Sequence, residues 1–176
     1  MLSVALLRGI NVGGNNKVDM KKLKAAFEAL GFENVRTYIN TGNVLFEHKK
    51  QSSKILAQNI QPFLKKIFGF EINLIVCEEA ILRNIAKAIP EAWTNDENEK
   101  TDVMFLWDGM NDPTVVERLK INPDVDRVKY VPGALLWNIK RKDFSKSGMS
   151  KIVGTLLYKQ MTVRNVNTTR KLAEIV

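Results

Sequence analysis

The sequence has one cysteine, one histidine and no long hydrophobic run. The single cysteine, Cys77, excludes a disulfide within these 176 residues and is typical of the reducing cytosol. One histidine and one cysteine cannot form a zinc cluster, so we expect no metal site. No apolar stretch approaches the ~20 residues of a membrane-spanning helix, and Arg8 interrupts the apolar N-terminus too early for a signal peptide. The sequence therefore predicts a cytoplasmic protein without a membrane partner or a cofactor.

The composition is that of a globular protein, with 45% apolar and 26% charged residues. It excludes disordered, collagenous and disulfide-rich classes, and the length fits one domain or two small ones.

The net charge of +8 is unevenly distributed along the chain. Residues 1–70 carry 11 basic and 4 acidic side chains, a net +7. Residues 71–128 carry 6 and 13, a net −7, and residues 129–176 carry 10 and 2, a net +8. Basic ends favour an anionic partner such as nucleic acid, although lysines on solvated helix faces would give the same excess.

Hydrophobic and turn patterns predict the order strand, helix, strand, strand, helix, strand in the first half. Asp19 is an N-cap candidate, and Pro62 would kink or split the second helix. The expected elements are strands over 3–7, 34–39, 44–47 and 71–77, and helices over 20–30 and from Ser52 or Ser53 to 68.

The second half repeats this order with little identity between the copies. After a linker helix over 78–88, the expected elements are strands over 101–107, 126–131, 134–140 and 162–164, and helices over 113–119, from Ser145 or Ser147 to 159, and 166–175. A repeated βαββαβ order is typical of the ferredoxin-like unit. The predicted fold is α+β, with two ferredoxin-like subdomains in tandem whose helices pack on antiparallel sheets. They cover 1–77 and 101–176, the latter with the C-terminal helix, and 78–100 forms a helical linker and an acidic loop.

The predicted topology brings two Asn/Gly-rich segments together. In a βαββαβ unit the first strand ends at the same end of the sheet as the hairpin between the second and third strands. The loop over 8–17 should therefore lie beside the turn over 40–43. Glycines can turn backbone N–H groups toward an anion, while arginine, lysine and asparagine add charge and hydrogen bonds. Either segment alone could equally be an ordinary turn.

Two segments near the C-terminus offer similar chemistry. Ser145 and Ser147 follow the basic run 140–142, where a helix start could hold a phosphate or simply be capped by serine. Residues 162–169 combine Arg164 with asparagines before a helix, and Asn165 or Asn167 is the expected N-cap.

Several known motifs do not fit. Gly9 and Gly14 have the P-loop spacing, but Asn15 occupies the lysine position. The aromatic residues of an RNA-recognition module are missing, and Phe46 is an expected core residue. His48 is expected to be a solvated loop residue and Cys77 a small core residue.

Three segments carry a family resemblance: LRGINVGG over 7–14, TYINTGNVLF over 37–46 and TVRNVNT over 162–168. They resemble an uncharacterised, mostly bacterial family catalogued as domain of unknown function 1697. That family usually has Trp where Val166 stands and Gln-Ser where Asn40-Thr41 stand. The resemblance implies a pair of ferredoxin-like subdomains and no established activity.

The leading functional hypothesis is a binding protein for phosphate-bearing ligands, either a nucleotide or nucleic acid. Two alternatives remain open: an enzyme that orients a small anionic or nucleotide substrate without a metal or a covalent nucleophile, and a protein–protein interaction module. The sequence does not decide whether a reaction is catalysed or which oligomer forms. The candidate ligand-binding residues are Arg8, Asn11, Gly13, Gly14, Lys17, Asn40, Thr41, Asn43, Arg164, Asn165 and Asn167.

Overall fold

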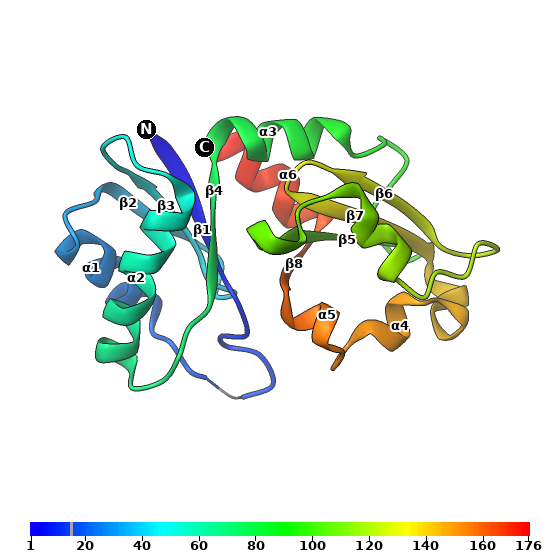
Figure 1. Ribbon diagram of the computed structural model, residues 1–176, viewed down its shortest axis with the longest axis horizontal. Helices are drawn as coiled ribbons and strands as arrows, with labels where there is room; N and C mark the ends of the chain where they lie inside the picture. The colour runs from blue at the N-terminus through cyan, green and yellow to red at the C-terminus, as the bar shows by residue number, and fades with distance from the viewer. Residues whose placement is uncertain (15) are drawn as a thin grey trace. The chain divides into compact units, whose positions relative to one another are not determined.

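A computed structural model describes residues 1–14 and 16–176. Asn15, in the loop predicted over 8–17, lies outside the described residues. The chain divides into two compact units, which we call unit 1 (Met1–Ala80 with Val176) and unit 2 (Ile81–Ile175). Each unit contains a four-stranded antiparallel sheet with helices, so the fold is mixed α+β (Figure 1).

The sheet of unit 1 has the strand order β2-β3-β1-β4, and all neighbouring strands are antiparallel. Strand β3 therefore lies between β1 and β2 and runs antiparallel to both, as predicted. The elements of unit 1 are β1 (Leu2–Leu7), α1 (Met20–Ala29), β2 (Glu33–Tyr38), β3 (Asn43–Glu47), α2 (Ser53–Phe68) and β4 (Leu74–Glu78).

Helices α1 and α2 pack on one face of this sheet (Figure 1). Their apolar side chains meet Ala5, Leu7 and Phe46 in one core, and Phe46 is fully buried as expected. The Asp19 carboxylate caps α1 by accepting a hydrogen bond from the Lys22 N–H at 2.7 Å. Helix α2 is not split at Pro62: it runs unbroken from Ser53 to Phe68, because buried residues on both sides of the proline keep one face packed.

Unit 2 has the corresponding strand order, β6-β7-β5-β8. Helix α3 begins directly after β4, and α6 follows β8. The elements are α3 (Glu79–Ala88), β5 (Glu99–Leu106), the 3-10 helices η1 (Asp108–Met110) and η2 (Pro113–Arg118), β6 (Arg127–Val131), β7 (Ala134–Lys140), the 3-10 helix η3 (Arg141–Lys146), α4 (Met149–Ile152), α5 (Leu156–Lys159), β8 (Met161–Asn165) and α6 (Val166–Ile175).

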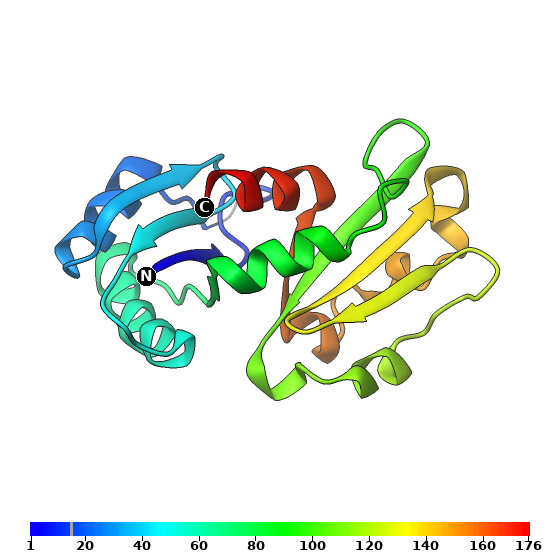
Figure 2. The ribbon, with the colours of Figure 1, turned by 90° about the horizontal axis from the view of Figure 1, so that it is seen from above.

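The core of unit 2 lies between its sheet and the short helices η2 and α4, with Trp137 fully buried in it. Helices α3 and α6 run side by side (Figure 2), joined by a 2.9 Å hydrogen bond from Arg83 Nη1 to the Ala173 carbonyl. Helix α6 also packs against β5 and β8. In the described part of the chain, no helix has the length and apolar character needed to cross a membrane.

Two predicted helices of unit 2 are wrong. The segment over 113–119 forms the 3-10 helix η2, and the helix expected up to residue 159 is broken into η3, α4 and α5. Between α4 and α5 the chain makes a tight turn, with Gly154 at φ +87° and the Thr155 N–H bonded to the Ile152 carbonyl at 3.1 Å. Glycine favours this left-handed conformation, so the chain reverses here and α4 is only four residues long.

Asp126, predicted as the start of a strand, is instead a buried hydrogen-bond acceptor. It accepts from the Trp137 indole at 3.0 Å, from the backbone N–H groups of Asn122 and Gly148 at 2.7 and 2.8 Å, and from the Ser147 hydroxyl. Ser147 is fully buried in this contact, so its hydroxyl does not face a phosphate.

Candidate functional site

The two Asn/Gly-rich segments of unit 1 meet, as predicted. The Leu7 N–H donates to the Gly42 carbonyl at 2.8 Å, and Asn11 Nδ2 donates to the Asn40 carbonyl at 2.9 Å. The end of β1 is thereby joined to the hairpin between β2 and β3.

Asn11 fixes the shape of the first loop. Its Nδ2 also donates to the Val18 carbonyl at 2.9 Å, and its Oδ1 accepts from the Val18 N–H at 2.8 Å. With φ at +55°, Asn11 adopts a left-handed conformation that asparagine tolerates better than most residues. Its side-chain amide is thus hydrogen-bonded within the protein, so its main role is to fix the conformation of the loop.

Asn43 has a similar role in the hairpin. It is fully buried, and its Nδ2 donates to the Tyr38 carbonyl at 2.9 Å and to Thr41 Oγ1 at 3.3 Å. Gly42, at φ +79°, leaves no room for a side chain, since a Cβ would lie 2.8 Å from Ile10 Cδ1 and from Leu7 Cβ. Thr41 and Asn40 remain exposed at the tip of the turn.

A pocket of about 540 Å³ opens where the two segments meet; we call it the loop pocket. Lys17 and Lys21 are exposed cations at its wall, and Asp19 is its acidic residue. The pocket also adjoins the N-terminus of α1, whose partial positive charge favours anions. Its lining residues are Asn11, Gly14, Lys17, Val18, Asp19, Met20, Lys21 and Asn40.

Four of the predicted residues, Asn11, Gly14, Lys17 and Asn40, thus line one pocket. Two other predicted residues of unit 1 lie in the same loop or before it. Gly13 is exposed at φ +60°, and Arg8 is half-buried with its backbone N–H bonded to the Asn73 carbonyl at 2.8 Å.

The predicted residues of unit 2 support its fold. Asn165 Oδ1 accepts from the Thr168 N–H at 2.8 Å at the start of α6, and Asn167 Nδ2 donates to the Asn95 carbonyl at 3.1 Å. Arg164 is buried and donates from Nη1 to Thr162 Oγ1 at 3.1 Å and to the Val163 carbonyl at 2.8 Å. Burial lowers the pKa of the Arg164 guanidinium to about 10, because loss of hydration disfavours the charged form.

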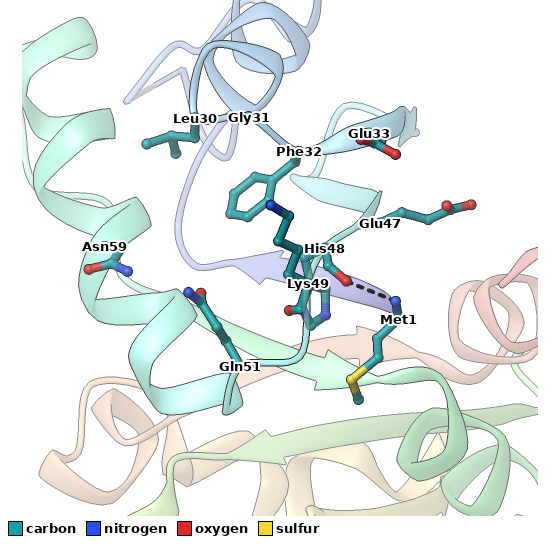
Figure 3. Close-up of a pocket in the computed structure, with 10 residues that line it drawn as sticks. All are labelled: Met1, Leu30, Gly31, Phe32, Glu33, Glu47, His48, Lys49, Gln51 and Asn59. Atoms are coloured by element: carbon teal, nitrogen blue, oxygen red, sulfur yellow. Dashed lines mark hydrogen bonds between the residues drawn. The ribbon is translucent and has the colours of Figure 1, made fainter.

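A second cavity of unit 1, about 700 Å³, has His48 among its lining residues (Figure 3). His48 is not the solvated loop residue that the sequence suggests: it is half-buried, and both ring nitrogens are hydrogen-bonded. Because the Lys49 carbonyl only accepts, the neutral ring carries its proton on Nδ1, at 2.7 Å from that oxygen. Nε2 then accepts from the buried Ser3 hydroxyl at 2.9 Å, which fixes the tautomer.

Cys77 is buried, as expected. Burial raises the pKa of its thiol to about 12, and the nearby Glu78 carboxylate adds to the increase. Within residues 1–14 and 16–176, no three His, Cys, Asp or Glu side chains are grouped in a way that could hold a metal ion.

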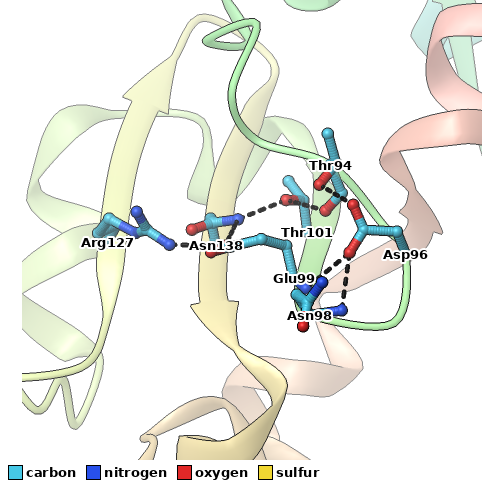
Figure 4. Close-up of polar contacts among 7 residues, drawn as sticks. All are labelled: Thr94, Asp96, Asn98, Glu99, Thr101, Arg127 and Asn138. Carbon is cyan, nitrogen blue, oxygen red and sulfur yellow. Dashed lines mark hydrogen bonds and ion pairs between the residues drawn. The ribbon is translucent and has the colours of Figure 1, made fainter.

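A polar cluster in unit 2 was not predicted (Figure 4). The Asn138 amide donates to Glu99 Oε2 at 3.0 Å and to Thr101 Oγ1 at 2.7 Å, and Arg127 pairs with the same Glu99 oxygen at 2.6 Å. Asp96 accepts from the backbone N–H groups of Asn98 and Glu99, a turn that the Asp-Glu-Asn sequence could have signalled. These contacts fasten the loop before β5 to the sheet.

The fold and pocket define an α+β protein with two four-stranded antiparallel sheets and a partly cationic loop pocket. The chain belongs to the family described as protein of unknown function DUF1697, which matches residues 1–137. The match confirms the predicted family; it includes the motifs over 7–14 and 37–46 and ends before the motif over 162–168.

The structure is similar to that of the conserved bacterial protein SP0830 from Streptococcus pneumoniae, with a TM-score of 0.76. The two share 24% sequence identity, and the similarity covers 99% of this chain and 97% of that chain. At this identity the similarity establishes the fold alone. Among curated proteins, none matches this chain.

Proposed function

We propose that the loop pocket of unit 1 binds the phosphate group of a nucleotide or nucleic acid. The observation that carries the proposal is the placement of two exposed lysines, Lys17 and Lys21, on the wall of one pocket beside the start of α1. Two lysines and one aspartate leave the pocket walls with one net positive charge. Exposed Asn40 adds an amide that can donate to a phosphate oxygen.

Binding fits this pocket better than acid–base catalysis. Asp19, its acidic residue, is engaged as the N-cap of α1, and the described lining residues include no histidine or cysteine. Lysine and amide groups of this kind hold and orient an anion. The same set would serve an enzyme only by orienting charge.

Calorimetric titration with pyrophosphate and with a single-stranded oligonucleotide at low salt tests the proposal. We expect Lys17→Ala combined with Lys21→Ala to weaken binding about tenfold or more, because each lysine contributes a charge-assisted contact. Lys54→Ala combined with Lys66→Ala is the matched control, since both are exposed lysines of α2 outside the pocket and the same two charges are removed. Equal weakening by the control, or no binding to the unmodified protein, would contradict the proposal.

We also propose that both units are ferredoxin-like and arose by duplication. The support is the equivalent strand order, β2-β3-β1-β4 and β6-β7-β5-β8, with antiparallel neighbours throughout. We further propose a cytoplasmic location. It is supported by the one free, buried cysteine, Cys77, because unpaired cysteines are typical of a reducing compartment. Fractionation of cells that express the full chain would test the location.

A further inference from the structure

Ile39, in the hairpin of unit 1, has a backbone conformation that isoleucine rarely adopts. Its φ is +49°, in the left-handed region where a β-branched side chain crowds the backbone. Glycine or asparagine would fit this position of the turn with less strain. The identity of the residue is therefore not explained by the turn itself.

Two side chains hold the backbone of the residues on either side of Ile39. Asn43 Nδ2 donates to the Tyr38 carbonyl, just before Ile39, and Asn11 Nδ2 donates to the Asn40 carbonyl, just after it; both distances are 2.9 Å. Strained residues persist where surrounding contacts over-determine them, and such positions concentrate at functional sites.

Burial of the Ile39 side chain in the core does not account for the strained backbone. Its side chain remains 46% exposed, and Val12 in the facing loop is 63% exposed. Each directly adjoins a residue of the loop pocket, since Ile39 precedes Asn40 and Val12 follows Asn11. Neither side chain is among those that line the pocket, but both residues belong to the two segments that the Asn11–Asn40 hydrogen bond joins there.

We propose that Ile39, together with Val12, forms the subsite for the base of a nucleotide whose phosphate lies in the loop pocket. This inference rests on the proposed function of that pocket and names the ligand more closely. A base is a flat ring with largely apolar faces, so it gains by covering exposed isoleucine and valine. A bare phosphate or a sugar phosphate gains nothing there.

The test compares ligands with and without a base by calorimetric titration of the full chain. The probes are ribose 5-phosphate, the four ribonucleoside monophosphates and a short single-stranded oligonucleotide. We expect the best monophosphate to bind about tenfold more tightly than ribose 5-phosphate, the gain expected from partly burying one aliphatic side chain. The oligonucleotide distinguishes the source of the base: tighter binding than the monophosphate points to nucleic acid, and weaker binding to free nucleotide.

Ile39→Asn separates recognition from folding, because asparagine accepts a positive φ but lacks the apolar surface. We expect the monophosphate advantage to disappear, the affinity for ribose 5-phosphate to stay within about twofold, and Tm to rise by about 2 °C as strain is relieved. Ile55→Asn is the matched control: Ile55 is 47% exposed on α2, away from the pocket, and its substitution should leave the ligand ratio unchanged.

The possible results discriminate between the two proposals. Equal affinity of the unmodified protein for ribose 5-phosphate and for all monophosphates overturns the base subsite and leaves phosphate binding standing. An advantage that survives Ile39→Asn, or a fall in Tm with that variant, also overturns the subsite. Failure of every phosphate compound to bind overturns both proposals.

Discussion

Units 1 and 2 share a strand order but differ in how they connect their strands. In unit 1 the connection between β3 and β4 is α2, a 16-residue helix with Ser52 at its N-cap and Gly69, at φ +81°, at its C-cap. In unit 2 the equivalent connection is broken into η3, α4 and α5. A buried carboxylate, Asp126, binds this broken segment through Ser147 and Gly148. The same sheet order is thus reached once through local helix signals and once through a contact between distant residues.

The largest expected effect comes from removing that contact. Asp126→Ala leaves the Trp137 indole, the Ser147 hydroxyl and two backbone N–H groups without their acceptor. We expect the free energy of unfolding to fall by about 3–5 kcal/mol in urea denaturation. Asp124→Ala, at an exposed aspartate two residues earlier, is the control and should change little. A loss below about 1 kcal/mol for Asp126→Ala would show that unit 2 does not depend on this carboxylate.

The same residue should make the protein sensitive to acid. Burial raises the pKa of Asp126, but the hydrogen bonds from Ser147, Asn122, Gly148 and Trp137 outweigh burial and hold the pKa below its usual range. A carboxyl whose folded-state pKa is lowered stabilises the fold above its unfolded pKa of about 4, and this contribution is lost as pH falls through the lowered value. We expect the urea midpoint to drop more steeply below pH 4 in the unmodified protein than in Asp126→Asn. Parallel pH profiles would refute this assignment.

The contrast between the units explains which parts of the fold could be predicted. Asp19 and Ser52 are capping signals directly before the helices they begin, and they predicted the starts of α1 and α2 well. Asp126 and Ser147 are 21 residues apart, and nothing local in the sequence indicates that they meet. Ser147 does mark a helix start, as predicted, since its hydroxyl accepts from the Met149 N–H at the first residue of α4 at 2.9 Å. The contact that the sequence did not indicate is the hydrogen bond that the same hydroxyl donates to the buried Asp126.

The candidate site shows the same division. Topology predicted that the loop and the hairpin would meet, because strand order alone places them at one sheet edge. Which side chains face outward depends on individual hydrogen bonds, so Asn11 and Asn43 were expected to bind ligand although the structure engages their amides internally. Lys21 was missed because it belongs to the helix pattern, and Ile39 because a strained φ leaves no mark in the sequence.

Asn43→Ala sharpens the comparison within unit 1, where the expected effect is intermediate. The buried Asn43 amide closes the hairpin turn by donating to the Tyr38 carbonyl on β2 and to the Thr41 hydroxyl in the turn. We expect a loss of about 2 kcal/mol in unfolding free energy, since one carbonyl loses its donor in a buried place. Hydrogen exchange should show increased opening of the turn over 39–42. Asn40→Ala, at the exposed neighbour, is the control and should leave exchange in the turn unchanged.

Asn165→Ala tests a local signal in unit 2. Its Oδ1 accepts from the Thr168 N–H at the start of α6, so its loss should cost about 1 kcal/mol, as for other N-cap substitutions. Asn165→Asp keeps an acceptor and should recover most of the urea midpoint. If the aspartate variant is no more stable than the alanine variant, Asn165 acts through something other than the cap.

The smallest effect separates folding from binding at one residue. Asp19 both caps α1 and places a negative charge on the wall of the loop pocket. Asp19→Asn retains a capping oxygen, because asparagine and aspartate are similar N-caps, and removes the charge. We expect unchanged stability and about threefold tighter pyrophosphate binding at low salt, with the gain shrinking as salt screens the pocket. Glu28→Gln, which removes one charge from the exposed face of the same helix, is the matched control. If both variants gain equally, net charge rather than the pocket governs the affinity.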